Sequence, residues 1–285
     1  MRLGVGPKML LTFIVLISVP VIILGYFSYS MASRSLQETV ENQLRETARL
    51  TAEAISRELD TAKDMLQIIA SNDSLREALE ESGDEERRLQ AHDYLKAMVQ
   101  EYHDVFESLI LTDARGVGLL DDRASSSPID YSDRQYVQQA LQGTLAVSDV
   151  IASRVTGNTV VAIGHPISSG SQVIGVLIGT VNFDHISEHA DAVSIGQSGY
   201  AYMVDREGVL IAHPVKEKIL TENLSHSDSP ELRQFVAQMK RGEAGEGFYT
   251  YEGVYKFVRF EPVAHWAVAV TANYDEYMAA ALEIR

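Results

Sequence analysis

The chain has 285 residues, of which 46% are hydrophobic, and this length and composition suit one or two folded domains rather than a disordered chain. Its formal net charge of -16 repels nucleic-acid phosphates, and no Lys/Arg-rich stretch offsets that charge, so the sequence argues against nucleic-acid binding. Cysteine is absent, which excludes thiolate nucleophiles, Cys-ligated zinc, iron–sulfur clusters and disulfides.

An uncharged, apolar segment follows a short basic N-terminus. Met9–Ser30 contains no charged side chain and consists mainly of Leu, Ile, Val and Phe, and about 20 apolar residues are enough for a helix to cross a bilayer. Arg2 and Lys8 precede the segment, and positive charge favours the cytoplasmic side. We therefore expect residues 1–33 to be a cytoplasmic N-terminus and a transmembrane helix that anchors the chain in the cell (inner) membrane.

A cleaved signal peptide is the alternative for the same segment, because Ser30–Ala32 offers small residues of the kind found at cleavage sites. The apolar part of a cleavable signal is typically about 7–15 residues long. The present run is longer, which favours an uncleaved anchor. Both alternatives export the rest of the chain to the periplasmic or extracellular side.

Residues 34–70 predict one long amphipathic helix. Apolar or small side chains recur at steps of three or four, while charged residues occupy the other faces. Such a helix is either a stalk that pairs with a second copy or a core helix of one domain. Both alternatives hold if its outer half packs on a domain and its inner half packs on a partner chain. We expect a homodimer through this stalk. The periodic positions are Leu36, Val40, Leu44, Ala48, Thr51, Ile55, Leu59, Ala62, Leu66 and Ile69.

The remainder of the chain repeats one order of elements twice. The first module, residues 71–190, is expected to hold a helix over 85–106, two strands, a short helix over 132–141 and three further strands. The second module, residues 191–273, has two strands, a helix over 230–241 and three strands. The expected strands are 108–112, 117–120, 146–152, 159–167 and 172–182, then 200–204, 209–212, 247–251, 254–261 and 266–272.

A short internal repeat supports two related modules. Leu111–Val117 and Met203–Val209 share the pattern apolar-x-Asp-x-x-Gly-Val, and each stretch connects the first two strands of its module. We infer an α+β fold with two tandem modules, each an antiparallel sheet with helices on one side.

These residues resemble the double Cache family of sensor domains. The stretch 199–214, with its Gly-Tyr, Asp-x-x-Gly and His-Pro pairs, is similar to the membrane-proximal module, and 133–143 with 148–150 is similar to the membrane-distal module. The resemblance covers residues 34–280. It implies two PAS-like modules in the extracytoplasmic part of a methyl-accepting chemotaxis receptor, a histidine kinase or a diguanylate cyclase, with a small-molecule pocket in the distal module.

Arg134 and Tyr136 are the first candidates for ligand contact. The guanidinium offers a planar fork of donors that suits a carboxylate, and the tyrosine offers an apolar wall with a hydroxyl. The resemblance implies the same, because the Arg of the matching motif binds the ligand carboxylate in amino-acid-binding members. The alternative for Arg134 is an internal salt bridge with Asp130, Asp133 or Asp149.

The sequence departs from the amino-acid-binding pattern where that pattern supplies carboxylates. Ser153 and Thr180 stand at positions expected to hold Asp, so a ligand ammonium lacks a strong counter-charge, and both could equally be ordinary strand residues. We therefore expect a small organic carboxylate without an ammonium group. The other departures are Ile129, Tyr136, Val137 and Ile151. The full set of candidate ligand contacts is Tyr131, Arg134, Tyr136, Ile151, Ser153 and Thr180, together with Asp121 and Asp149, which are the first carboxylates to test if amino acids bind.

Other clusters favour structural roles. His185 and His189 have helical i, i+4 spacing but no assignable third ligand, so a solvated helix face is preferred to a metal site. His213, which precedes a proline at a strand end, is expected to be a structural hydrogen-bonder. Asp121–Asp122 is more typical of a turn than of acid–base catalysis, and no nucleophile elbow, phosphate loop or Rossmann motif occurs. We expect no enzyme activity, no cofactor and no metal.

The sequence leaves three functions open. A receptor sensor is the leading hypothesis, and residues 274–285 are then expected to form a helix that leads toward a second membrane segment. An anchored enzyme of the cell envelope is the second, and a ligand-free dimerisation module is the third.

Overall fold

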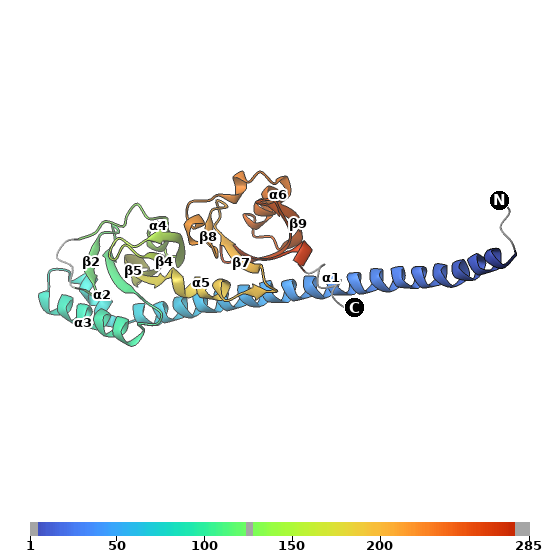
Figure 1. Ribbon diagram of the computed structural model, residues 1–285. Coiled ribbons are helices and arrows are strands. Elements are labelled where there is room, and N and C mark those ends of the chain that lie inside the picture. The colour runs from blue at the N-terminus through green and yellow to red at the C-terminus, as the bar shows by residue number, and fades with distance from the viewer. Residues whose placement is uncertain (1–4, 124–127, 277–285) are drawn as a thin grey trace.

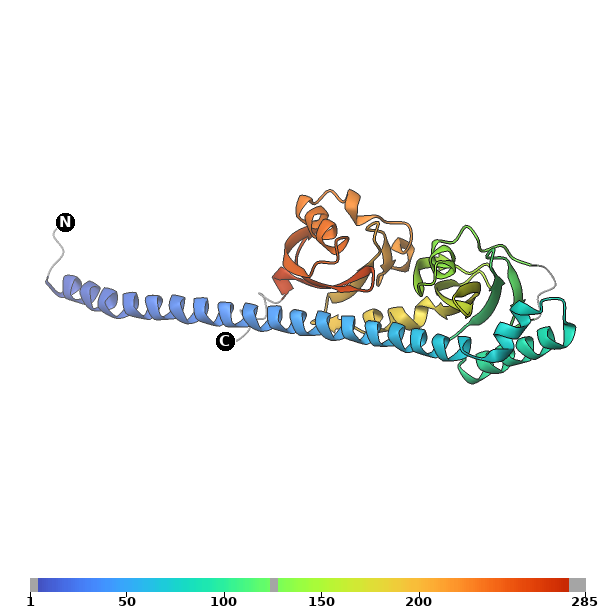
Figure 2. The ribbon, with the colours of Figure 1, turned by 180° about the vertical axis from the view of Figure 1, so that it is seen from behind.

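The computed structural model describes the backbone of residues 5–123 and 128–276. A single helix, α1 (Val5–Ala70), runs the length of the molecule, and two globular modules lie side by side along its C-terminal part (Figures 1 and 2). The N-terminal part of α1 projects beyond both modules. The predicted helix over 274–285 lies almost entirely outside the described residues, as does Arg2.

The free end of α1 is the part that suits a bilayer. It is the one described helix that is long and apolar enough to cross a membrane, and Pro20 lies inside it. Its large apolar side chains have no protein cover: Leu16, Ile17, Val21, Ile22, Leu24, Tyr26 and Phe27 are all more than half exposed. A surface of this kind is compatible with a lipid environment.

The distal module begins with two helices, α2 (Asp73–Glu80) and α3 (Glu85–Glu101), which pack with α1 on one face of a five-stranded antiparallel sheet. The opposite face carries α4 (Gln135–Leu141), which is shorter than the predicted 132–141 because Arg134 is its N-cap. The strand order is β2-β1-β5-β4-β3. The strands are β1 (Ser108–Asp113), β2 (Gly118–Asp121), β3 (Ala146–Ala152), β4 (Thr159–Ser169) and β5 (Gln172–Asn182).

Helix α5 (Phe183–Asp191) leads from the distal sheet to the proximal module. This module is a six-stranded antiparallel sheet of order β6-β7-β11-β10-β9, with β8 paired to β7 and α6 (Pro230–Met239) on one face. Its remaining elements are β6 (Ser194–Ile195), β7 (Gly199–Val204), β8 (Leu210–Ala212), η1 (Lys216–Lys218), η2 (Leu224–His226), β9 (Gly245–Tyr251), β10 (Val254–Val263) and β11 (Trp266–Asn273).

The repeated Asp-x-x-Gly motif folds as the same turn in both modules. The Asp113 carboxylate accepts the backbone N–H groups of residues 115 and 117 at 2.9 Å, and Asp205 accepts those of residues 207 and 209 at 2.9 and 2.8 Å. Gly116 and Gly208 have φ of 82° and 85°, a left-handed conformation that favours glycine. The carboxylate thus closes the turn and the glycine permits it, which explains the recurrence.

The apolar stripe of α1 packs on both modules of its own chain. Leu44 and Ala48 are fully buried in the core that includes strands of the proximal sheet, and Leu66 and Ile69 are buried in the same core at the distal sheet. The expectation that the inner part of the stripe faces a second copy is therefore wrong at Leu44, because its side chain is already covered. The side chain of Leu36 lies outside the described residues.

Polar contacts fix α1 to the modules at its sides. Arg45 donates two hydrogen bonds, of 2.6 and 2.7 Å, to the carboxylate of Glu246 in β9. Glu58 lies 2.7 Å from Nε2 of His189 in α5.

At the end of the proximal module, the Glu276 carboxylate accepts the N–H of Gln197 and the hydroxyl of Ser198 in the turn between β6 and β7.

Burial along the stripe predicts the cost of shortening one side chain. Leu66→Ala removes a fully buried side chain between α1 and the distal sheet, whereas Leu89→Ala, on α3, trims a side chain that is 58% exposed. We expect the first to lower the free energy of unfolding by about 2–5 kcal/mol and the second to change it by less than about 0.5 kcal/mol. Denaturant melts of the full chain in detergent measure both, and equal losses would contradict the packing described here.

Candidate functional site

Helix α4 lies close against the distal sheet and positions the predicted contact residues at its first turn. Tyr136, Val137 and Ala140 are buried in one cluster with Ile110 and Ile178 of the sheet. Gly164 in β4 makes this approach possible, because a Cβ there would lie 3.1 Å from the backbone oxygen of Tyr136. Arg134 is the N-cap residue of α4, and its own φ and ψ of -81° and 124° are extended.

A cavity of about 220 Å³ opens at the start of α4. Four predicted contact residues, Arg134, Tyr136, Asp149 and Ile151, line it, together with Arg206, which comes from the repeated turn of the proximal module. The cavity therefore lies where the two modules meet, with walls from α4 and β3 on one side and the β7–β8 turn on the other. The remaining lining residues are Asp133, Gln135, Gln139, Val147 and Ser148.

Arg134 is the cation of this cavity that has no ion pair with any residue the structure describes. Its Nε is buried and has no hydrogen-bond partner among the described residues. The three carboxylates considered as its salt-bridge partners are engaged elsewhere. Asp133 pairs with Arg154 at 2.6 Å, Asp149 pairs with Arg206 at 2.9 Å, and the Asp130 carboxylate accepts the N–H of Ser132 at 2.8 Å.

Asp149 connects the two modules. Its Oδ1 accepts a hydrogen bond from Nε of Arg206 at 2.9 Å and lies 3.2 Å from Nε2 of His265, and both partners belong to the proximal module. The contacts with His265 and Arg206 lower the pKa of the Asp149 carboxyl against the opposing effect of burial. Asp149 is thus an ionised bridge between the modules at the edge of the cavity.

The other predicted residues do not line this cavity. Tyr131 is 4% exposed, its hydroxyl has no described partner, and burial raises its pKa to about 12. Thr180 is buried in β5, on the face that carries α4, and donates to the backbone oxygen of Ser108 at 3.3 Å. Asp121 is also buried, and its carboxylate accepts the N–H of Arg123 at 3.0 Å.

Ser153 has a local role. Its hydroxyl oxygen accepts the backbone N–H groups of Val155 and Thr156, each at 3.2 Å, in the turn that follows β3. This is a serine turn, which satisfies the backbone without any ligand.

Several polar residues of the cavity were not among the predicted contacts, and Gln139, Ser148 and Arg206 illustrate why. Gln139 is one turn after Tyr136 on α4, so helical spacing could have indicated it. Ser148 bonds the N–H of Ala162 at 2.9 Å, which looks like an ordinary strand contact. Arg206 belongs to a turn about 70 positions away, and only the packing of one module on the other brings it here.

Metal-ligand chemistry has no support in the part of the chain that the structure describes. No group of three or more His, Asp or Glu side chains there could hold a metal ion. His189 of the predicted His185–His189 pair instead contacts Glu58 of α1 at 2.7 Å.

Solved structures with the same fold include an extracellular domain of a histidine kinase and a ligand-binding domain. The extracellular domain of the putative histidine kinase mmHK1S-Z2 has a TM-score of 0.66 at 16% identity, and the match covers 84% of this chain and 98% of that one. The ligand-binding domain of Mlp24 with asparagine has a TM-score of 0.65 at 18% identity, covering 88% and 99%. At these identities the likeness shows the fold.

Curated relatives are chemotaxis receptors. The methyl-accepting chemotaxis protein PscA of Pseudomonas syringae pv. tomato is 24% identical over 293 aligned positions, which cover 100% of this chain and 43% of that protein. The chain spans about two-fifths of the length of the curated relatives it matches.

A family model described as Cache domain matches residues 32–281, which include the stalk part of α1 and both sheets. The match agrees with the two antiparallel modules, the repeated turn and the long N-terminal helix described above. The chain belongs to the Cache domain family and has the double Cache architecture of a receptor sensor domain.

Proposed function

We propose that this chain is the extracytoplasmic sensing region of a transmembrane chemotaxis receptor, and that it binds a small organic carboxylate at the cavity beside α4. The observation that carries the proposal is Arg134, a guanidinium with a buried, unpartnered Nε at a cavity of about 220 Å³. A buried donor on a charged group is costly to leave unsatisfied, so an anion that satisfies it gains affinity.

The chemistry of the walls suits a small acid. The guanidinium can hold both oxygens of a carboxylate at once, and a hydrogen bond to a charged group typically contributes about 1.5–3 kcal/mol. Tyr136 and Ile151 supply apolar surface for a short carbon chain, and Gln139 and Ser148 supply neutral hydrogen-bonding groups. The cavity is large enough for a metabolite of a few carbon atoms.

An α-ammonium group is disfavoured by the state of the carboxylates. Asp133 and Asp149 both line the cavity, and each is already paired with an arginine. A free amino acid would have to share the Asp149 carboxylate with Arg206 and His265 to gain a counter-charge for its ammonium. Asparagine, the ligand in the Mlp24 structure, is therefore not the ligand that we propose for this chain.

Receptors of other output classes remain the second candidate. Extracellular domains of putative histidine kinases share the fold as closely as chemoreceptor domains do. The curated chemotaxis relatives favour the chemotaxis assignment, because the alignment extends over the whole chain, α1 included. The absence of a catalytic motif in the sequence argues against an envelope enzyme.

Membrane topology follows from α1. Met9–Ser30 is proposed to cross the inner membrane with its basic N-terminus in the cytoplasm, and both modules then lie outside. The exposed apolar side chains from Leu16 to Phe27 support this placement.

The ligand cavity is well placed to act on the contact between modules. Arg206 and Asp149 belong both to its lining and to the bridge between modules. A ligand carboxylate near Arg134 lies in the field of this bridge, so it favours some relative positions of the modules over others. Such unequal affinity for two arrangements is what a ligand needs in order to shift their populations.

Arg134 provides the direct test of the ligand. A thermal-shift screen of the full chain against mono- and dicarboxylic acids identifies a binder, since a ligand that binds only the folded state raises the melting temperature. We expect Arg134→Lys to lower its affinity roughly tenfold or more, because charge is kept but the fork is lost, and Arg134→Ala to lower it further. Calorimetry measures both.

The control is Arg115→Ala, an arginine with an 83% exposed side chain on a turn of the same module. It should leave affinity unchanged. Unaltered ligand affinity in a folded Arg134→Ala protein would remove the basis of the proposal, and tight binding of ordinary L-amino acids would refute the discrimination against ammonium.

The bridge between modules can be tested by distance measurement. The cysteine-free chain accepts spin labels at introduced Thr144→Cys and Lys240→Cys, one in each module. We expect Asp149→Asn to broaden the distance distribution, and the exchange of charges in Asp149→Arg with Arg206→Asp to narrow it again. Glu243→Gln, which breaks an ion pair within the proximal module, is the control, and a distribution that Asp149→Asn leaves unchanged would contradict the coupling.

We propose a homodimer through the outer side of α1. Leu50 and Ile68 are 48% and 68% exposed, and their separation of 18 positions is five turns of about 3.6 residues, so both lie on one face. Single cysteines at these two positions should cross-link copies in membranes, while a cysteine at the buried Leu44 should not. The reverse pattern, or no cross-link at either exposed position, would refute this interface.

A further inference from the structure

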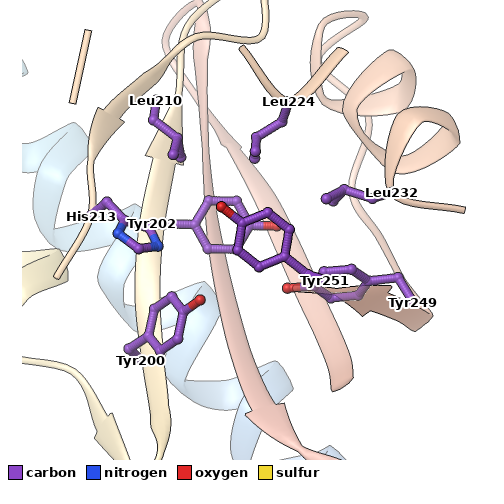
Figure 3. Close-up of a pocket in the computed structure, with 8 residues that line it drawn as sticks. All are labelled: Tyr200, Tyr202, Leu210, His213, Leu224, Leu232, Tyr249 and Tyr251. Atoms are coloured by element: carbon purple, nitrogen blue, oxygen red, sulfur yellow. The ribbon is translucent and has the colours of Figure 1, made fainter. Parts of the chain in front are cut away.

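The proximal module has a polar cavity of its own, between its sheet and the chain that follows β8. Tyr200 and Tyr202 of β7, and Tyr249 and Tyr251 of β9, extend from one face of the sheet, and His213 closes the side (Figure 3). Leu210, Leu224 and Leu232 form the apolar wall. The enclosed volume is about 10 Å³, which is room for about one water molecule.

Two groups that line this cavity, the Tyr202 hydroxyl and Nε2 of His213, can donate a hydrogen bond to a ligand. The Tyr202 side chain is 3% exposed, and its hydroxyl lies near the Tyr249 hydroxyl but makes no hydrogen bond of good geometry among the described residues. His213 is 4% exposed, and its Nδ1 accepts the N–H of Val215 at 3.0 Å. Burial and the nearby Lys218 lower the pKa of His213, so the imidazole is neutral with its proton on Nε2, which is a donor.

Lys256 adds a cation that forms no ion pair with the described residues, although the charge of Glu252 acts on it from a distance. This residue of β10 pairs in register with Tyr249 and is only 7% exposed. Its Nζ lies 4.6 Å from the centroid of the Tyr200 ring and donates one hydrogen bond, of 3.3 Å, to the Tyr200 hydroxyl. No carboxylate among the described residues lies within the 4.0 Å of an ion pair, and burial lowers the pKa of Lys256.

The carboxylates of this region are occupied by another lysine. Lys218 pairs with Glu252 at 2.6 Å and lies 3.6 Å from Glu222, and the Tyr251 hydroxyl donates to Glu222 at 2.7 Å. These groups lie at the mouth of the cavity, where Tyr251 also lines an open groove. The cavity is thus lined by donors, with the Lys256 ammonium beside its Tyr200 wall, while the carboxylates are paired at its mouth. An anion is the occupant that balances such a site.

We propose that this cavity is a second ligand site, distinct from the one at Arg134, and that it takes a monocarboxylate of acetate size. The carboxylate is held by the Lys256 ammonium, the Tyr202 hydroxyl and Nε2 of His213, and its methyl group packs against the leucines. The small volume restricts the ligand to the smallest acids and requires Tyr251 to swing toward the open groove as the acid enters.

The test uses the full chain in nanodiscs with [1-¹³C]acetate as the probe. Binding is followed by the carboxyl NMR signal and by calorimetry, with sodium chloride at the same ionic strength as the reference. We expect Lys256→Met, which keeps the length of the side chain, to lower acetate affinity at least about tenfold. Tyr202→Phe, which removes only the unpartnered hydroxyl, should lower it about two- to tenfold without lowering the ligand-free melting temperature.

Two matched variants test whether acetate binds in this cavity and not at another cation of the chain. Lys240→Met removes an exposed lysine of the same module and should leave acetate affinity unchanged. Arg134→Ala should also leave it unchanged, so failure of the distal proposal and failure of this one give different results. The inference is overturned if acetate does not bind, if Lys256→Met and Tyr202→Phe bind it like the unaltered protein, if chloride stabilises equally, or if only Arg134→Ala abolishes binding.

Discussion

The burial of one stripe of α1 is the interaction on which the rest of the structure depends. From Leu44 to Ile69 its apolar side chains complete the cores of both modules, so neither sheet has a finished core without the helix. The two modules are thereby held along a common axis, and the short α5 connects them. The same helix continues as the apolar segment suited to a bilayer, so the sensing part and the membrane part share one continuous backbone.

The two candidate sites use one principle in different ways. At α4 an arginine keeps a buried donor without a partner, because two neighbouring carboxylates pair with other arginines and the third accepts a backbone N–H. In the proximal sheet a buried lysine has an aromatic ring and one hydroxyl as its partners. In both places the chain, whose net charge is -16, concentrates local positive charge against its global field. Such sites select anions through desolvated, directed donors rather than through long-range attraction.

Sequence patterns predicted the architecture because its determinants are local and periodic. The helical spacing of α1, the repeated Asp-x-x-Gly turn and the uncharged segment each follow from neighbouring residues alone, and the family model and the two sheets confirm the double Cache fold. The residues of the two candidate sites were harder to predict from the sequence. Arg134 and Tyr136 could be named from a motif, but Arg206 enters the same cavity from another module, and the grouping of Lys256 with Tyr202 depends on strand register. Leu44 was assigned to the wrong partner, because periodicity shows that a face is apolar without showing what covers it.

The uninterrupted helix has a mechanical consequence. Leu44 is the first apolar side chain of α1 that the modules bury completely, and the 28 residues from there back to Leu16 span about 42 Å at about 1.5 Å per residue. This stretch acts as a lever arm that pivots at the proximal sheet. There, Arg45 of α1 is hydrogen-bonded to Glu246 of β9. A tilt of only about 2° at the fulcrum moves the far end by about 1.5 Å, which is comparable to the helix shifts of about 1–2 Å seen in known allosteric transitions. A rearrangement between the modules that is too small to alter either fold is therefore large enough to displace the apolar segment of α1 that we propose crosses the bilayer.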